Sequence, residues 1–185
     1  SDIVTLAGKL SFTYPVQLKD LEQALSLIHN SKKSPLKITQ QDSIGYAFQF
    51  KSQPIDRKIP DQTFLLKLNK DALKLKKGIN EKIKLILANQ FQATRIQTSI
   101  SKKHPKIQID FSDPLKAQQD IRGLITVNNI KEKKVKFKII GNSVHVIAPF
   151  KSGKTYTLDI SPGILSKRNF QTKKPKSFSI KFKNI

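Results

Sequence analysis

The sequence has no cysteine, methionine or tryptophan among its 185 residues, and it contains no long apolar run. The missing thiols exclude disulfides, zinc–thiolate sites and cysteine nucleophiles. No segment approaches the roughly 20 consecutive apolar residues of a membrane-spanning helix. Apolar residues nevertheless make up 37% of the chain and occur along all of it. We therefore expect a folded core rather than disorder.

Basic residues are abundant, but almost all of them are of one kind. The formal net charge is +22 and the pI is about 10.2, yet arginine occurs only at Arg57, Arg95, Arg122 and Arg168. Proteins that read nucleic acid specifically rely on arginine for bidentate and stacked contacts. Lysine, in contrast, is common on exposed strand faces and edges. We therefore interpret the charge mainly as a solvated surface.

Short segments in which apolar and polar residues alternate dominate the sequence. Such alternation places one side of a strand on a core and the other side in water. The clearest segments are residues 10–14, 107–111, 135–139, 144–147, 155–160 and 179–183. Turn-forming residues separate several of them, as at Gly141-Asn142 and Ser161-Pro162-Gly163. The pattern predicts an all-β sandwich or barrel.

Two segments have the apolar spacing of short helices. Residues 18–25 place leucines at 18, 21 and 25, and residues 115–124 follow Asp113-Pro114, a typical helix start. Each segment is only about two turns long. We expect a short helix or an irregular crossover at each, rather than an element of a helical bundle.

The order of these elements occurs twice along the chain. Phe12-Thr13-Tyr14-Pro15-Val16 aligns with Phe111-Ser112-Asp113-Pro114-Leu115, and residues 62–66 align with residues 154–158. The spacing of the two copies is close to the ~100 residues of one immunoglobulin-like sandwich. A polar, proline-containing stretch, residues 99–105, separates the copies. We therefore predict two domains, residues 1–98 and residues 99–185.

The second copy carries several segments that together resemble one protein family. They are Phe111-Ser112-Asp113-Pro114-Leu115, residues 120–127, residues 141–146, residues 153–158, Pro162-Gly163-Ile164 and residues 178–182. In this combination they resemble the N-terminal macroglobulin-like (bacterial immunoglobulin-like) domains of bacterial α2-macroglobulins, especially those of Bacteroidetes. The resemblance is strong over residues 105–185 and extends to residues 8–90 mainly through the repeat.

The resemblance implies a fold, a role and a location. The fold would be all-β, with two tandem immunoglobulin-like (macroglobulin-type) β-sandwiches. The role would be that of a non-catalytic scaffold segment in a large protease inhibitor, a protease trap, of the periplasm or cell envelope. The partners would be other domains of the same protein and, through the full-length protein, proteases. The family's thioester needs cysteine, so the resemblance assigns no catalytic, metal-binding or cofactor-binding residue to this chain.

Residues that bind metals are few and scattered. His29, His104 and His145 lie far apart in the sequence, whereas a metal site needs clustered ligands. Asp110 and Asp113 flank the end of a predicted strand, but calcium needs several oxygen ligands. Asp113 precedes a proline, so a cap at the start of a turn or helix explains it better. We expect no metal, no cofactor and no enzyme activity.

Two lysine clusters form the candidate basic contact surface, made of Lys131, Lys133, Lys134, Lys173, Lys174 and Lys176. Solvated turns and strand edges explain these clusters most simply. The functional alternative is electrostatic contact with an acidic partner, nucleic acid or an anionic lipid surface. We expect weak contact with anionic surfaces and no specific nucleic-acid recognition. A binding or spacer module of a bacterial surface adhesin and a lysine-rich nucleic-acid-binding protein remain alternatives, because a fold does not fix a function.

Overall fold

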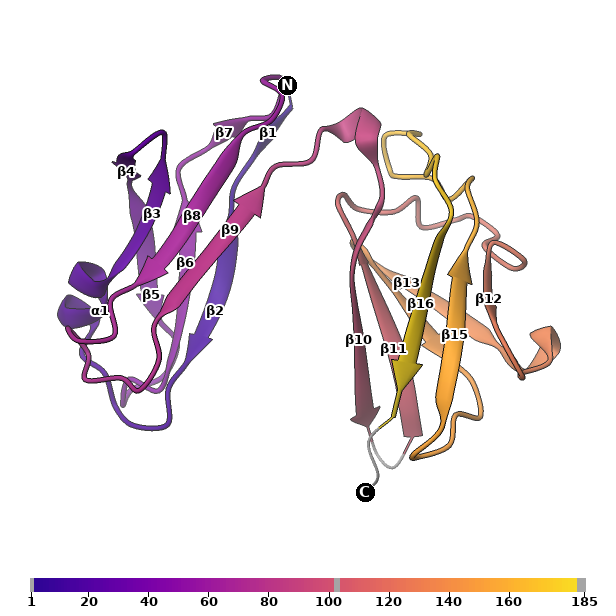
Figure 1. The fold of residues 1–185 in the computed structure, drawn as a ribbon. Helices are drawn as coiled ribbons and strands as arrows, with labels where there is room; N and C mark the ends of the chain where they lie inside the picture. The colour runs from indigo at the N-terminus through magenta and orange to yellow at the C-terminus, as the bar shows by residue number, and fades with distance from the viewer. Residues whose placement is uncertain (1, 102–103, 183–185) are drawn as a thin grey trace. The chain divides into compact units, whose positions relative to one another are not determined.

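The computed structural model describes residues 2–101 and 104–182, and the protein is mostly β, with 48% strand and one short α-helix (Figure 1). The chain forms two compact units, Ser1–Ile86 and Leu87–Ile185. Each unit has its own cluster of buried hydrophobic residues. No helix within the described ranges is long and apolar enough to cross a lipid bilayer.

The first unit contains two main antiparallel sheets. One has the order β2-β6-β5, formed by Ala7–Ser11, Ala47–Ser52 and Leu36–Gln40. The other has the order β4-β3-β8-β9, formed by Lys32–Ser34, Leu25–His29, Thr63–Leu68 and Ile79–Lys84. A short pairing joins β1 (Ile3–Val4) to β7 (Ile55–Asp56). The expected helix forms as α1 (Leu18–Ala24), directly before β3.

Alternation in the sequence builds the core of this unit. Strand β8 buries Phe64, Leu66 and Leu68, and β6 of the other sheet contributes Phe48 and Phe50 to the same cluster. Burying a large apolar side chain stabilises a fold by about 1.5–3 kcal/mol. The two sheets are therefore held together by the side chains that the period-two pattern predicts to be apolar.

The second unit also has two antiparallel sheets. The larger has the order β10-β11-β14-β13, formed by Ala93–Ser101, His104–Phe111, Ser143–Ile147 and Lys136–Ile140. The smaller has the order β12-β15-β16, formed by Ile125–Val127, Thr155–Ile160 and Lys176–Lys181. Two 3₁₀ turns, η1 (Ala88–Gln90) and η2 (Glu132–Lys134), precede β10 and β13. Buried residues of both sheets form one cluster.

Strand order repeats between the two units. The order β2-β6-β5 of the first unit corresponds to β11-β14-β13 of the second, and β3-β8-β9 corresponds to β12-β15-β16. Strand β15 alternates buried and less buried residues in the same order as β8, with Tyr156, Leu158 and Ile160 in the core. The duplication that the sequence predicts is thus present in the strand order as well.

Both units contain an equivalent corner, formed by a pair of backbone hydrogen bonds. In each, two backbone hydrogen bonds of 2.8 and 2.9 Å join the segment that follows one strand to a turn between two others. The donor and acceptor residues are Phe12–Tyr46 and Val16–Gly45 in the first unit, and Phe111–Asn142 and Leu115–Gly141 in the second. The predicted alignment of residues 12–16 with residues 111–115 is therefore confirmed by equivalent contacts.

Several boundaries differ from those expected. The chain divides between Ile86 and Leu87, whereas the boundary expected between residues 98 and 99 falls inside β10. A register shift between Ala93 and Arg95 interrupts the alternation of β10, which hides this strand in the sequence. The first main strand spans Ala7–Ser11 rather than residues 10–14. Residues 115–124 form an irregular crossover, which is one of the two conformations expected there.

Candidate functional site: the basic edge of the second unit

Strand β13 lies at the edge of the four-stranded sheet and, among the described strands, pairs with β14 alone. Among the described residues, no backbone hydrogen bond joins residues 136–140 to any segment other than β14. In an antiparallel pair, alternate residues point their N–H and C=O groups away from the partner strand. The outer side of β13 therefore presents backbone donors and acceptors to solvent.

Lysines line the approach to this edge and the edge itself. Turn η2 is closed by the bonds Lys134 N–H to Lys131 O (2.8 Å) and Val135 N–H to Glu132 O (2.9 Å), which direct the chain into β13. The exposed lysines here are Lys131, Lys133, Lys134, Lys136 and Lys138, which we call the basic edge. The sequence predicted the first three as contact residues. The sequence does not predict Lys136 and Lys138 as contact residues, because alternation shows which side of a strand faces solvent but not which strand lies at the edge of a sheet.

A groove of about 490 Å³ lies beside β13, with residues 117–122 as its other wall. Buried Ile121 and half-buried Phe137 and Ile139 line it. At its rim, Arg122 Nη2 lies 2.5 Å from Asp120 Oδ2 in an exposed ion pair. The side-chain hydrogen bonds from Arg122 lower the pKa of Asp120 to about 2. The groove thus combines an apolar floor with a charged rim.

A polar network occupies the outer face of the same sheet. Asp110 accepts hydrogen bonds from Gln97 (2.9 Å), Gln108 (2.8 Å) and the Ser143 hydroxyl (2.6 Å). Burial raises the pKa of Asp110, but these hydrogen bonds outweigh burial and lower it overall. Donors from three side chains therefore surround this carboxylate. Within residues 2–101 and 104–182, no group of three His, Cys, Asp or Glu side chains could hold a metal ion.

The two histidines whose side chains are described lie in different environments. His145 lies on the outer face, opposite Gln108 and Lys138. Burial, followed by the charges of Lys106 and Lys138, lowers its pKa, and the charge of Asp110 opposes this shift. His29 stacks on Phe64 with ring centroids 4.3 Å apart. Neither position brings histidines together. The side chain of the third, His104, lies outside the described residues.

The second predicted lysine cluster divides into exposed and engaged residues. Lys173 and Lys174 are exposed in the loop before β16. Lys176 is half-buried, and its ammonium group donates to Gln92 Oε1 (3.1 Å) and Ala93 O (2.5 Å). Lys176 thus ties the start of β16 to the start of β10. Because β16 and β12 are opposite edges of one sheet, and η2 follows β12, the two clusters do not form one surface.

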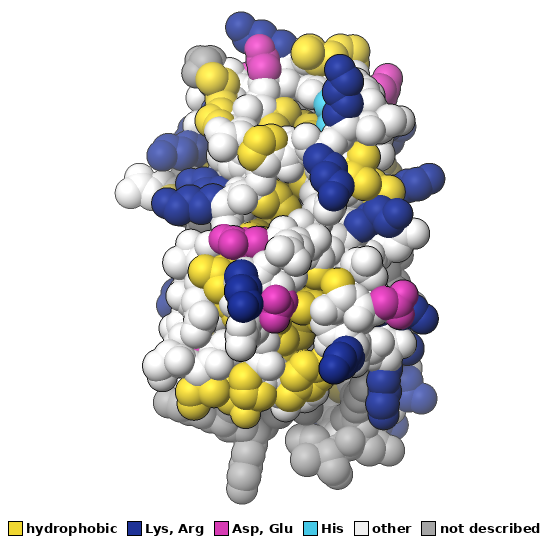
Figure 2. Space-filling view, turned by 90° about the vertical axis from the view of Figure 1, so that its left-hand side faces the viewer, with side chains coloured by type: hydrophobic (Ala, Val, Ile, Leu, Met, Phe, Trp, Pro, Cys, Tyr) yellow, Lys and Arg dark blue, Asp and Glu magenta, His cyan; other side chains and the backbone are white. Residues whose placement is uncertain are grey.

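Basic side chains also lie on the surface of the first unit. Figure 2 shows lysine and arginine side chains scattered among apolar, acidic and uncharged ones.

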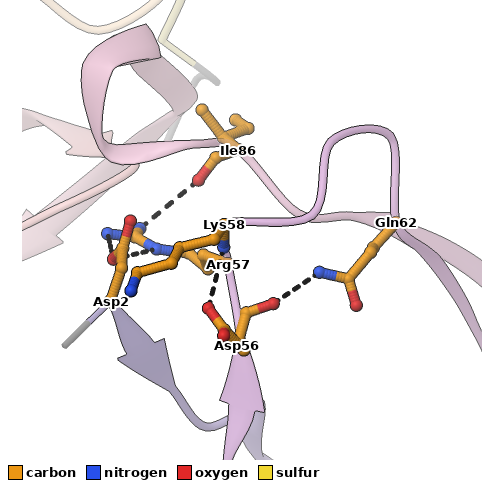
Figure 3. A network of polar contacts seen from close by, with 6 residues as sticks. All are labelled: Asp2, Asp56, Arg57, Lys58, Gln62 and Ile86. Atoms are coloured by element: carbon orange, nitrogen blue, oxygen red, sulfur yellow. Dashed lines mark hydrogen bonds and ion pairs between the residues drawn. The ribbon is translucent and has the colours of Figure 1, made fainter.

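A largely buried ion pair joins the two ends of this unit (Figure 3). Arg57 donates through Nε and Nη2 to Asp2 Oδ1 at 2.9 and 2.8 Å, and through Nη1 to Ile86 O at 3.3 Å. Buried Gln62 donates to Asp56 O at 2.6 Å. This network joins the first described residue of the unit to its last residue.

We take the basic edge and its groove as the candidate contact site of the described chain. They bring together exposed charge, an apolar surface and an open sheet edge. Comparison of the whole chain with models of known protein families and with curated proteins finds no match in either.

Proposed function

We propose that the chain is a non-catalytic scaffold built from two immunoglobulin-like, macroglobulin-type β-sandwich domains. The observation that carries this proposal is the repeated strand order, β2-β6-β5 with β3-β8-β9 and β11-β14-β13 with β12-β15-β16. Separate hydrophobic clusters in the two units support the assignment of each as an independent module. Modules of this kind serve to position other parts of a protein.

The parent protein in this proposal is a bacterial α2-macroglobulin-like protease inhibitor of the periplasm or cell envelope. The support comes from the sequence resemblance of residues 105–185 and from the equivalent corners at residues 12–16 and 111–115. A trap that encloses a protease needs rigid modules around the enclosed space. The chain would supply two of them, with the other domains of the parent as its permanent partners.

An adhesin-like spacer is the second candidate, because two similar units in tandem also suit an extended surface protein. The rest of the parent sequence separates the two candidates. Further copies of the same unit favour the adhesin, whereas a downstream Cys-x-Glu-Gln thioester motif favours the trap. The lysine-rich nucleic-acid binder is less favoured, and it requires an affinity that falls steeply with salt.

The trap proposal is tested with the full-length protein and a protease of broad specificity. After incubation, the protease is assayed on a small peptide and on a large protein substrate. We expect activity on the small substrate to persist and activity on the large one to fall, because enclosure excludes substrates by size. Equal activity on both substrates would remove the trap and favour the spacer.

A further inference from the structure

Strand β13 is open to a further strand along its outer side. Because β14 is its one pairing partner among the described residues, alternate backbone N–H and C=O groups have no strand to pair with. The groove between β13 and residues 117–122 runs beside this open side. Domains that bind extended peptides by strand addition combine such an edge with adjoining side-chain pockets.

We propose that the basic edge and its groove bind an extended acidic segment of a partner protein, which joins the sheet next to β13. Alternation fixes the side chains that such a segment needs. Residues level with Lys136 and Lys138 point to the same outer face as these lysines, so acidic residues fit there. Residues level with Phe137 and Ile139 point into the groove, so apolar residues fit there. This interaction goes beyond the scaffold role and does not depend on it.

The charge of the edge favours an acidic partner over a second copy of the chain. All five lysines of the basic edge are exposed. Pairing two β13 strands edge to edge would bring lysines of like charge close together, which destabilises a sheet. An acidic strand would instead place opposite charges at cross-strand positions. The whole chain, with a net charge of +22, adds to the attraction.

The uncharged surroundings favour a polypeptide over nucleic acid. The exposed large hydrophobic residues described in the second unit are Ile140 and Ile147, which are aliphatic and lie on the outer face beside the lysines. Single-stranded nucleic acid binds largely by stacking on aromatic side chains, and arginine is the side chain that adds stacked and bidentate contacts. Arg122, the arginine at the groove, donates three side-chain hydrogen bonds to Asp120.

The first test uses the whole chain and a labelled peptide of sequence Glu-Val-Glu-Val-Glu-Val, blocked at both ends. Its control is the same peptide with N-methyl groups on alternate residues, which keeps the charges but removes the backbone donors of one edge. Binding is followed by fluorescence anisotropy, and hydrogen exchange reports the backbone amides of residues 136–140. We expect the parent peptide to bind and to slow exchange at these amides, and the methylated peptide to bind at least about tenfold more weakly.

The second test compares two double variants with the same change of charge. K136E/K138E reverses two charges on β13, and K173E/K174E reverses two exposed charges on the loop before β16. Circular dichroism checks that both variants are folded. We expect K136E/K138E to weaken peptide binding at least about tenfold and K173E/K174E to change it by less than about threefold.

Four results would overturn the proposal. The first is no binding of the parent peptide at low salt. The second is equal binding of the methylated peptide, which would show attraction of charge without strand pairing. The third is an equal loss in both double variants, which would show a dependence on net charge alone. The fourth is displacement of the peptide by a single-stranded DNA oligonucleotide of higher affinity, which would assign the edge to nucleic acid.

Discussion

Arg57 Nη2 lies 2.8 Å from Asp2 Oδ1, although the two residues are 55 positions apart in the sequence. Their side chains are only 5% and 15% exposed. Removing one member of a buried ion pair leaves the other charge buried and costs about 3–5 kcal/mol. Arg57→Ala should therefore destabilise the first unit by about this amount, measured by urea unfolding of the whole chain with hydrogen exchange resolved by unit.

Arg122→Ala is the matched control for this prediction. The Arg122–Asp120 pair has side chains that are 74% and 59% exposed, and exposed pairs contribute about 0–1 kcal/mol. The second unit should lose correspondingly little stability. Equal losses for the two variants would mean that burial does not set the strength of the Arg57 contact.

Gly45 and Gly141 occupy equivalent corners but should tolerate a side chain differently. Gly45 has a φ of +100°, and a Cβ there would lie 2.3 Å from the carbonyl oxygen of Val16. Gly141 has a φ of +58° and no atom within 4 Å of such a Cβ. Gly141→Ala should cost about 1–2 kcal/mol of backbone strain, and Gly45→Ala clearly more, because the backbone must move. The free energy of unfolding of each variant checks this order, and similar costs would argue against it.

Leu158 lies at the centre of the core of the second unit, with 0% exposure. Leu158→Ala should destabilise that unit by about 2–5 kcal/mol through lost burial and a cavity. Because the two hydrophobic clusters share no residue, amide exchange in the first unit should stay unchanged. The matched variant Leu66→Ala should show the opposite distribution. Loss of protection in both units of either variant would mean that the cores are coupled.

Much of the fold could be predicted from the sequence, because alternation and turn residues are local signals. The repeat of residues 12–16 predicts the corner at residues 111–115, and the strict alternation of apolar and polar residues predicts β15. Strand β10 was missed because its register shift breaks the period of two. The candidate site was predicted only in part. The sequence predicts Lys131 as a contact residue. The edge position of β13 and the hydrogen bond from Lys176 to Ala93 O depend on tertiary contacts, which no local pattern shows.

Stability of the second unit should depend on pH through His145. Burial, followed by the charges of Lys106 and Lys138, holds the pKa of His145 below its ordinary value of 6.5. The unfolded chain therefore binds a proton at a higher pH than the folded chain does. Stability should be fully present above pH 6.5 and should decline as the pH falls from there through the lowered pKa. Urea unfolding of the chain and of His145→Gln at several pH values checks this, and an unchanged profile in the variant would contradict it.

Asp110 should add a second, more acidic step. The hydrogen bonds that it accepts hold its pKa below the ordinary value of 3.8, so the folded state loses their contribution as the pH falls below that value. Asp110→Asn should remove this step. Because the charge of Asp110 raises the pKa of His145, the same variant should keep the His145 step but move it to lower pH. A variant in which both steps vanish would show that the two groups titrate as one.

The most direct test of the scaffold role is the size-selective protease assay on the full-length protein from which residues 1–185 have been deleted. The intact protein serves as the reference, and cleavage of both forms by the protease is followed on gels. We predict that the shortened protein is still cleaved but no longer shields the protease from the large substrate. Shielding as complete as that of the intact protein would contradict the account, because the enclosure would then form without these two units.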